Sequence, residues 1–418
     1  MGKPELPATI TRAIRAKAQE ILPRRSSVAP GKYLFYISDL PLSPSSSHRY
    51  VLLSLIKSIL HLSAHNEVSL LVFGKFATQD GEPRRITPIT AQWPKGIENF
   101  FTSHLDQQEQ LRFRVLFCEE KTYFENFSSL ILQTAESQAE ILFFGRGNFT
   151  IPLANRLLHP YFPCVSVLFN IENNFGIFSD SVISHLKVDV SKKNAAERAA
   201  DFFQIKLPVI FPQTGNFSEE KSTSRAEESF ILISAIGHDR ISRALSRLSA
   251  DIIERFLEGV FSVASIEWHI VGESSESNLS ELNPRFNDLI SAGRIKVISY
   301  VEDLSTYYEQ CHAYLQPPGV TGGGRAGGIQ AALAKLPVIR FNRCDADARL
   351  PPLVEDPTLE SGLAHLERLV FDENQRSLEG ELNFEAAISA LNDFDTTNLE
   401  KALEKAKRNF SLRTTQTS

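Results

Sequence analysis

Short apolar runs alternate along the chain with longer segments in which apolar residues recur with the period of a helix. The short runs are typical of strands buried on both faces. Strands of this kind, separated by helices, form parallel sheets that are covered by helices on both sides. The runs lie at 33–37, 68–73, 114–118, 140–144 and 165–169, and again at 230–234, 266–271, 294–299, 312–315 and 336–341. We therefore expect an α/β protein with two doubly wound halves.

A polar segment separates the two halves. Residues 214–229 read TGNFSEEKSTSRAEES and contain few large apolar side chains, as is typical of a linker between domains. Residues 31–213 would then form an N-terminal Rossmann-like domain, and residues 230–394 a C-terminal one. A basic segment at 1–30 precedes them. The helix and tail at 395–418 have an apolar face that would allow the helix to cross back to the first domain.

The composition is that of an ordinary globular protein, with 42% hydrophobic and 22% charged residues in a chain of 418. The net charge of −6 argues against general nucleic-acid binding. Four cysteines occur without a CxxC pair, and no histidine, cysteine or acid cluster has metal-ligand spacing. We therefore expect a reducing compartment and no metal site. The sequence has neither an apolar run of membrane-spanning length nor a signal-peptide core, which indicates a cytoplasmic protein.

The basic segment at 1–30 has two interpretations. Residues 8–22 have apolar positions at helical spacing, and lysine and arginine outnumber the acids in the whole segment. A basic amphipathic helix can rest on an anionic membrane surface, so peripheral membrane association is one interpretation. A solvated helix packed on the first domain is the favoured one.

The most informative stretch is residues 311–341, CHAYLQPPGVTGGGRAGGIQAALAKLPVIRF. An apolar strand is followed by a glycine-rich turn, a helix and a further strand. In open α/β sheets such a turn lies at the carboxyl end of its strand, where ligands bind. Glycine allows close approach to the backbone, and the helix start and Arg325 supply positive charge. The pattern favours a phosphate or diphosphate site, although it lacks the Gly-Lys-Ser/Thr of a P-loop.

Three sequence segments in the second half resemble those of a known family: IEWHIVGES, VISYVEDLSTYYEQCHAYLQPPG and GGGRAGGIQAALAKLPVI. In their order and spacing, over about residues 228–342, the chain resembles the retaining glycosyltransferases of the GT-B fold, close to family 4. The triple glycine is similar to that of bacterial enzymes that build surface polysaccharides or glycosylate proteins. The resemblance implies two Rossmann-like domains facing a central cleft, with the acceptor bound by the first and a nucleotide-sugar donor by the second.

The resemblance also implies roles for individual residues. Arg240 would face the donor diphosphate and assist catalysis, and Gln330 would hold the ribose hydroxyls. Two further candidates rest on their position in the sequence and not on the resemblance. Glu273 ends a strand on the cleft side and could hold a sugar hydroxyl. His48, at the end of the first crevice loop, is either a catalytic residue that could touch donor or acceptor, or a polar residue at a helix start. The remaining predicted donor-binding residues line the base, the phosphates or the sugar: Tyr300, Val301, Thr321, Gly322, Gly323, Gly324 and Arg325.

The implied reaction transfers a sugar from a nucleoside diphosphate, with UDP as the expected nucleotide, to a saccharide or protein acceptor. Such an enzyme would be a hexosyltransferase of the retaining, metal-independent type. Arginines and helix-end N–H groups can stabilise a leaving diphosphate without a metal. No cofactor is expected, because the nucleotide sugar is a substrate.

The sequence departs from the family pattern at three positions. Gln330 stands where the family usually has glutamate, and the family's other acidic residue would fall about at Gly322. A lysine commonly follows the arginine in the family, whereas this chain has Arg243 and Arg247. These departures leave open a catalytically silent GT-B subunit that binds a partner glycosyltransferase or the acceptor. Turnover of the donor, as opposed to binding alone, distinguishes the two functions.

Two further interpretations are less favoured. A nucleotide-sugar epimerase on the same fold would need an acid or base beside the sugar, and no residue is compelling in that role. A periplasmic sugar-binding protein also has two α/β lobes, but it would require a signal peptide.

Overall fold

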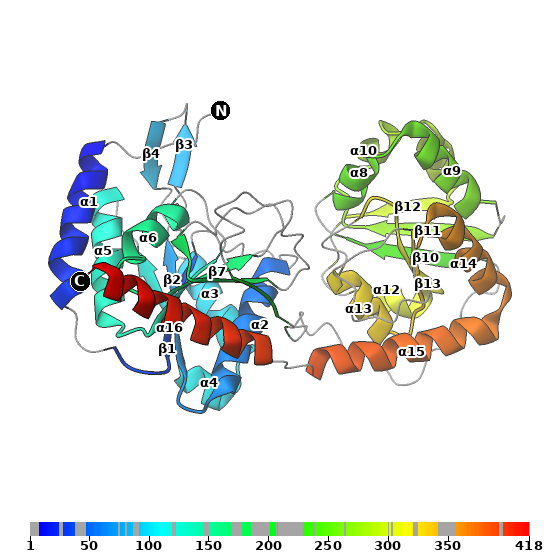
Figure 1. Ribbon diagram of the computed structural model, residues 1–418. Helices are drawn as coiled ribbons and strands as arrows, with labels where there is room; N and C mark the ends of the chain where they lie inside the picture. The colour runs from blue at the N-terminus through cyan, green and yellow to red at the C-terminus, as the bar shows by residue number, and fades with distance from the viewer. Residues whose placement is uncertain are drawn as a thin grey trace. The chain divides into compact units, whose positions relative to one another are not determined.

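The structure is a computed structural model in which the chain divides into two compact units, Met1–Ile210 with Asp393–Ser418, and Phe211–Asn392 (Figure 1). Each unit is considered by itself. The residues that the structure describes are 8–24, 28–37, 47–73, 76–79, 82–86, 92–118, 123–145, 150–168, 178–184, 201–205, 207, 229–236, 239–262, 265–299, 301, 304–320, 325–341, 357–392 and 396–417.

The first unit is built on a seven-stranded sheet in the order β5-β2-β1-β6-β7-β8-β9, in which all neighbouring strands are parallel. The chain order reverses between β1 and β6, as in a doubly wound Rossmann-like sheet. A separate antiparallel hairpin pairs β3 with β4. The strands are β1 (Lys32–Ile37), β2 (Glu67–Phe73), β3 (Phe76–Gln79), β4 (Glu82–Ile86), β5 (Phe113–Cys118), β6 (Ile141–Phe144), β7 (Cys164–Leu168), β8 (Ser181–Ser184) and β9 (Phe202–Gln204).

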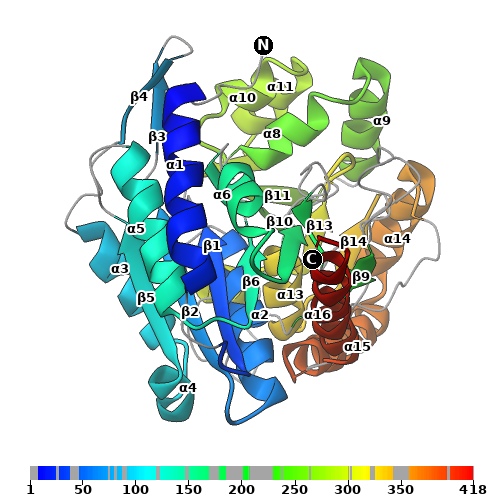
Figure 2. The same cartoon turned by 60° about the vertical axis from the view of Figure 1, so that its left-hand side comes forward.

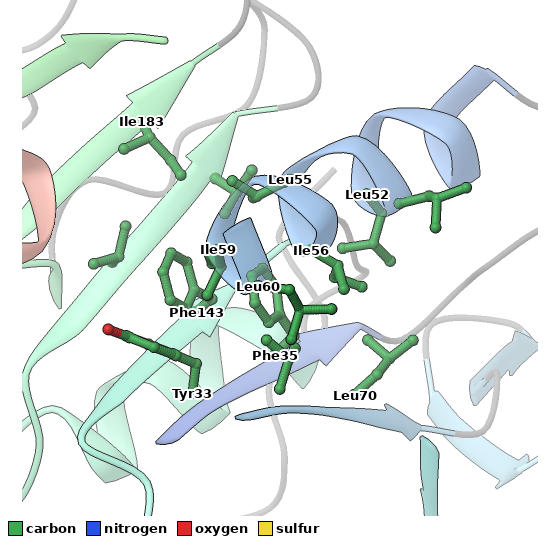
Figure 3. Close-up of a cluster of buried hydrophobic side chains, with 14 of the residues drawn as sticks. Tyr33, Phe35, Leu52, Leu55, Ile56, Ile59, Leu60, Leu70, Phe143 and Ile183 are labelled. Atoms are coloured by element: carbon green, nitrogen blue, oxygen red, sulfur yellow. The ribbon is translucent and has the colours of Figure 1, made fainter. Parts of the chain in front are cut away.

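Helices cover both faces of this sheet. The helices of the unit are α1 (Ala8–Ile21), α2 (Ser47–Leu62), α3 (Gln92–Thr102), α4 (Gln107–Leu111), α5 (Tyr123–Glu136), α6 (Thr150–Leu158) and α16 (Thr397–Thr417), with a 3-10 turn at Leu22–Arg24. Because successive side chains of a strand point to opposite faces, Phe35 of β1 packs with Leu52 and Ile56 of α2 on one face (Figure 3). Tyr36 packs on the other face in a cluster with α1, α5 and α6.

Helix α1 lies beside α5 in both views of the molecule (Figure 2). It buries Ile14 and Ala18 in the cluster under α5 and α6, while Arg12 and Arg15 are exposed. The apolar face of the basic segment is therefore covered by the first unit. No helix among the described residues is long and apolar enough to cross a membrane.

Helix α16 packs against β7, β8 and β9 of the first unit. Ser181 Oγ in β8 donates to the carbonyl of Ala402 at 2.9 Å. Arg413 donates to the carboxylate of Asp180, a side chain that is only 4% exposed. A buried carboxylate is tolerated when it is paired and hydrogen-bonded, so this ion pair fixes the last turns of the chain to the first unit.

The second unit is built on a five-stranded parallel sheet in the order β12-β11-β10-β13-β14. Helices α8, α9 and α10 lie on one side of it, and α12 and α13 on the other (Figure 1). The strands are β10 (Phe230–Ala235), β11 (Ile266–Val271), β12 (Ile295–Ile298), β13 (Ala313–Gln316) and β14 (Val338–Arg340). The helices are α8 (Arg240–Leu245), α9 (Ala250–Val260), α10 (Ser277–Ser280), α11 (Arg285–Ser291), α12 (Ser305–Gln310), α13 (Arg325–Leu333), α14 (Leu359–Phe371) and α15 (Glu373–Asn392).

Each described unit thus has a doubly wound parallel sheet, and the predicted α/β fold class is confirmed. One helix of the prediction is wrong in its extent. The apolar positions from Ile241 to Phe256 suggest a single helix, but the structure has α8 and α9 with a break between them. Ser249 caps α9 by accepting from the N–H of Ile252 at 3.4 Å. Both helices bury their apolar residues in one cluster, which explains why the periodicity continues across the break.

Candidate functional site

The candidate site of the second unit lies where its strand order reverses. The neighbouring strands β10 and β13 are parallel, and each is followed in the chain by a helix, α8 after β10 and α13 after β13. Connections from such a pair leave on opposite sides of the sheet, which opens a ligand crevice at the carboxyl ends of the strands. Arg240 begins α8 and Arg325 begins α13, so both cations follow strands that meet at this point.

The beginning of α8 is held by Glu273, which follows the end of β11. One carboxylate oxygen of Glu273 accepts from the N–H groups of Ile241 and Ser242, both at 3.0 Å. The other oxygen accepts from the Ser242 hydroxyl at 2.8 Å. The Glu273 side chain is 1% exposed. These three donors compensate the cost of burying the charge, and the carboxylate satisfies N–H groups that would have no partner within the helix.

Asp239, the residue before α8, in turn contacts the segment that follows β11. Its Oδ1 accepts from the Ser274 N–H at 2.6 Å and from Asn278 Nδ2 at 3.2 Å, and its own N–H donates to the carbonyl of Gly272 at 3.2 Å. The hydrogen bond from the Ser274 N–H is the main reason why the pKa of Asp239 is lowered, since it stabilises the ionised form. Asp239 has a φ of 52°, in the left-handed region that aspartate tolerates better than most residues. The connections after β10 and β11 are therefore bound to each other.

The connection that follows β13 packs on the backbone of α8. Gly319 has a φ of 81°, and a Cβ atom there would lie 2.8 Å from the carbonyl oxygen of Ala244. Only glycine fits this approach without strain. Gln316 is 1% exposed, and its Nε2 donates to the carbonyl of Val320 at 3.0 Å, which fixes the start of the connection. The chain that leads into the glycine turn is thus positioned against α8.

Helix α13 approaches the end of β10 closely at Gly327. A Cβ atom at this position would lie 2.3 Å from the carbonyl oxygen of Ala235 and 2.7 Å from the hydroxyl of Tyr314. The Tyr308 hydroxyl donates to the carbonyl of Gly327 at 3.2 Å. Burial raises the pKa of Tyr308 well above its ordinary value, so the hydroxyl stays protonated as a donor. The helix behind the glycine turn is therefore seated directly on the central strand.

The predicted donor-site residues are described to different extents. Arg240 is half-buried at the start of α8, and Gln330 is 6% exposed within α13. Val301 is half-buried in the segment after β12. Arg325 is the first residue of α13, but its side chain lies outside the described residues. Five further predicted residues lie entirely outside the described residues: Tyr300, Thr321, Gly322, Gly323 and Gly324.

His48 belongs to the first unit. It is the second residue of α2, and its side chain lies outside the described part of the structure, so its predicted contact with donor or acceptor stays a prediction. Among the described residues, no group of three or more histidine, cysteine, aspartate or glutamate side chains could hold a metal ion.

Several residues that build the site have no role in the sequence analysis. Asp239, Ser242, Gly319 and Gly327 act through contacts with residues distant in the chain. The only sequence signal for them is the glycine content around the predicted turn. The sequence predicts a sugar hydroxyl as the partner of Glu273, and this contact stays a prediction; in the structure its carboxylate accepts from Ile241 and Ser242 of α8.

No protein-family model matches the chain, and no curated protein matches it. Solved structures do resemble it. HepE from Anabaena, in complex with UDP and glucose, has a TM-score of 0.53 at 12% identity, covering 89% of this chain and 98% of its own. A glycosyltransferase from Rickettsia africae has a TM-score of 0.54 at 13% identity, covering 91% and 99%. Sucrose-phosphate synthase from Thermosynechococcus elongatus has a TM-score of 0.51 at 12% identity, covering 88% and 97%.

At such low identity these similarities establish the fold alone. They extend over nearly the whole of each chain. Together with the two parallel, doubly wound sheets, they identify the architecture as that of the GT-B fold.

Proposed function

We propose that the protein is a glycosyltransferase that moves a sugar from a nucleotide diphosphate, with UDP as the favoured nucleotide, to a saccharide or protein acceptor. The observation that carries the proposal is the position of Arg240. It begins a helix at the switch point of the second sheet, and the residues on both sides of it are fixed by the connection after β11. A cation placed at this edge suits a diphosphate.

The proposed chemistry follows from that position. Charge develops on the diphosphate as the bond to the sugar breaks, and a preorganised guanidinium stabilises that charge more in the transition state than in the ground state. In the proposal Arg240 supplies this charge, the turn at 321–324 and Arg325 lie along the phosphates and sugar, and Gln330 meets the ribose. The proposal includes a retaining reaction without a metal, as the resemblance to GT-B family 4 implies.

A second candidate is a catalytically silent subunit that binds a partner glycosyltransferase or an acceptor. The specific observation in its favour is Gln330. This side chain is 6% exposed in α13, at the place where the resemblance leads one to expect glutamate. Glutamine can donate and accept hydrogen bonds, but it carries no charge.

The test is to incubate the purified protein with a panel of nucleotide sugars and to follow both the melting temperature and nucleotide release. A ligand that binds the native state raises the melting temperature by mass action. We expect stabilisation by one donor together with slow release of its nucleotide. Stabilisation without release, even with added cell-extract acceptors, would favour the silent subunit. No response to any nucleotide would contradict a donor site at the glycine turn, and with it the transferase.

A further inference from the structure

The carboxylates of Glu273 and Asp239 form a reciprocal pair of contacts between two connections of the second unit. Glu273 comes from the connection after β11 and accepts from the first turn of α8. Asp239 comes from the connection after β10 and accepts from the Ser274 N–H and from Asn278. Each carboxylate thus holds the backbone of the other's connection. We call these two residues the carboxylate clamp.

Arg240 lies in the chain between the two contacts of the clamp. The residue before it is Asp239, and the two residues after it, Ile241 and Ser242, donate their N–H groups to Glu273. The backbone of Arg240 is therefore fixed from both sides. The side chain of Asp239 does not cap α8, so the helix start depends on Glu273 for its cap.

The clamp also decides which groups can meet an anion. The two N–H groups of α8 that Glu273 occupies at 3.0 Å are already bound to a carboxylate. A second anion at the same groups would be repelled by the buried charge. A phosphate beside α8 would then meet the Arg240 side chain and not the N–H groups of Ile241 and Ser242.

We propose that Glu273 is a positioning residue that holds Arg240 in the conformation that receives the donor diphosphate. This inference rests on the proposed function and deepens it. A guanidinium on a backbone fixed in advance loses less conformational freedom on binding, so it contributes more to affinity and to the transition state. Glu273 acts through Arg240 and touches no part of the donor.

The test is a double-mutant cycle on UDP binding, measured by calorimetry with the full chain. Glu273→Gln replaces the charged acceptor by an amide whose NH₂ group cannot accept from the N–H groups of α8. We expect E273Q to weaken UDP binding about tenfold, and R240A to weaken it at least about tenfold, the scale of one charge-assisted hydrogen bond. Because Glu273 acts through Arg240, adding E273Q to R240A should produce no further loss.

Two comparisons separate positioning from a general structural effect. Uridine has no phosphate, so its affinity should be the same for E273Q and wild type. Glu281→Gln, an exposed carboxylate of the same unit, is the matched control and should leave UDP binding unchanged. If E273Q fails to fold, the same cycle is run with Ser242→Ala, which removes the 2.8 Å contact of its hydroxyl with Glu273 and a weaker 3.2 Å contact with the Asp239 carbonyl. For S242A we expect a loss of about two- to fivefold, smaller because both backbone contacts remain.

Two outcomes would overturn the inference while leaving the proposed function intact. In the first, the wild-type protein binds UDP, but E273Q or S242A lowers the UDP affinity of R240A by the same factor as it lowers that of wild type. The other is an equal loss of uridine and UDP affinity. Absence of UDP binding by the wild-type protein would instead contradict the proposed function, and the inference with it.

Discussion

Substitution of Gly327 by alanine tests how the helix behind the glycine turn is seated. The new Cβ atom would lie 2.3 Å from the Ala235 carbonyl oxygen and 2.7 Å from the Tyr314 hydroxyl. The carbonyl belongs to the end of the central strand, so it cannot rotate away as a side chain could. Helix α13, which carries Gln330, must therefore move away from the end of β10. We expect a less stable second unit and weaker UDP binding.

The magnitude follows from two opposing effects. Overpacking of a close contact costs about 1–3 kcal/mol. Alanine regains roughly 0.5–1 kcal/mol relative to glycine inside a helix. Together these ranges give an expected net loss in the free energy of unfolding of about 0–2.5 kcal/mol, which for a unit of this size lowers the melting temperature by up to roughly 10 °C.

Urea unfolding followed by tryptophan fluorescence measures this loss. The chain has two tryptophans, and Trp268 is fully buried in the second unit. In a Trp93→Phe background its emission reports the second unit alone. Gly259→Ala is the matched control, because the three atoms nearest to its Cβ, the first at 2.3 Å, all belong to the Leu363 side chain, which can change rotamer. If G327A is as stable as wild type and binds UDP equally well, the proposed seating of α13 on β10 is wrong.

Three further perturbations have defined outcomes. Burial alone would raise the pKa of Glu379, but hydrogen bonds led by that from His365, at 2.7 Å, lower it. The stabilising contribution of the Glu379 carboxylate is therefore present above its unfolded-state pKa of about 4.3 and is lost as the pH falls through the lower folded value. The free energy of unfolding of E379Q, measured in urea, should therefore depend less on pH between about 3 and 5 than that of wild type. R413A should destabilise the first unit by about 3–5 kcal/mol in urea unfolding, because the buried Asp180 carboxylate loses its cation. Q330E should strengthen calorimetric UDP-sugar binding several-fold, because a charged acceptor makes stronger hydrogen bonds to ribose hydroxyls.

Each of these expectations has a result that would contradict it. For Glu379, the free energies of unfolding of wild type and E379Q would change with pH to the same extent. For Arg413, the first unit of R413A would unfold at the wild-type urea concentration. For Gln330, donor binding would weaken in a Q330E protein whose melting temperature without ligand is unchanged.

The strands of both sheets could largely be predicted from the sequence. The apolar run at 33–37 corresponds to β1 (Lys32–Ile37), and that at 266–271 corresponds to β11 (Ile266–Val271). Strands covered on both faces have almost no polar positions, so their signal is strong over a few residues. Strand β8 was missed, because its sequence SVIS has buried serines at both ends. One of them is satisfied by Ala402 of α16, a contact that no local pattern contains.

The sequence pattern predicts a helix only near 383–391, whereas helix α15 spans Glu373–Asn392. Gly380 reads as a helix breaker in the sequence. In the structure a Cβ at Gly380 would lie 2.3 Å from the carbonyl oxygen of Lys335, so the glycine allows α15 to approach the turn after α13. A contact 45 residues away in the chain (380 minus 335) therefore explains a residue that looks unfavourable locally.

The candidate site was predictable in location but not in construction. A glycine turn and Arg240, each after a predicted strand, point to the carboxyl edge of the second sheet, and the structure places those two strands, β13 and β10, side by side. The contacts of Glu273 with α8 join residues more than thirty positions apart. Such contacts follow from which strands are neighbours, which a single sequence does not specify. The predicted roles of the donor-site residues themselves stay predictions.

The most direct test of the central claim is a calorimetric titration of the wild-type and R240A proteins with UDP. Wild type should bind UDP saturably, and R240A should bind it at least about tenfold more weakly, at an unchanged melting temperature without ligand. Absence of binding to wild type, or equal affinity in a folded R240A protein, would contradict a diphosphate site at Arg240.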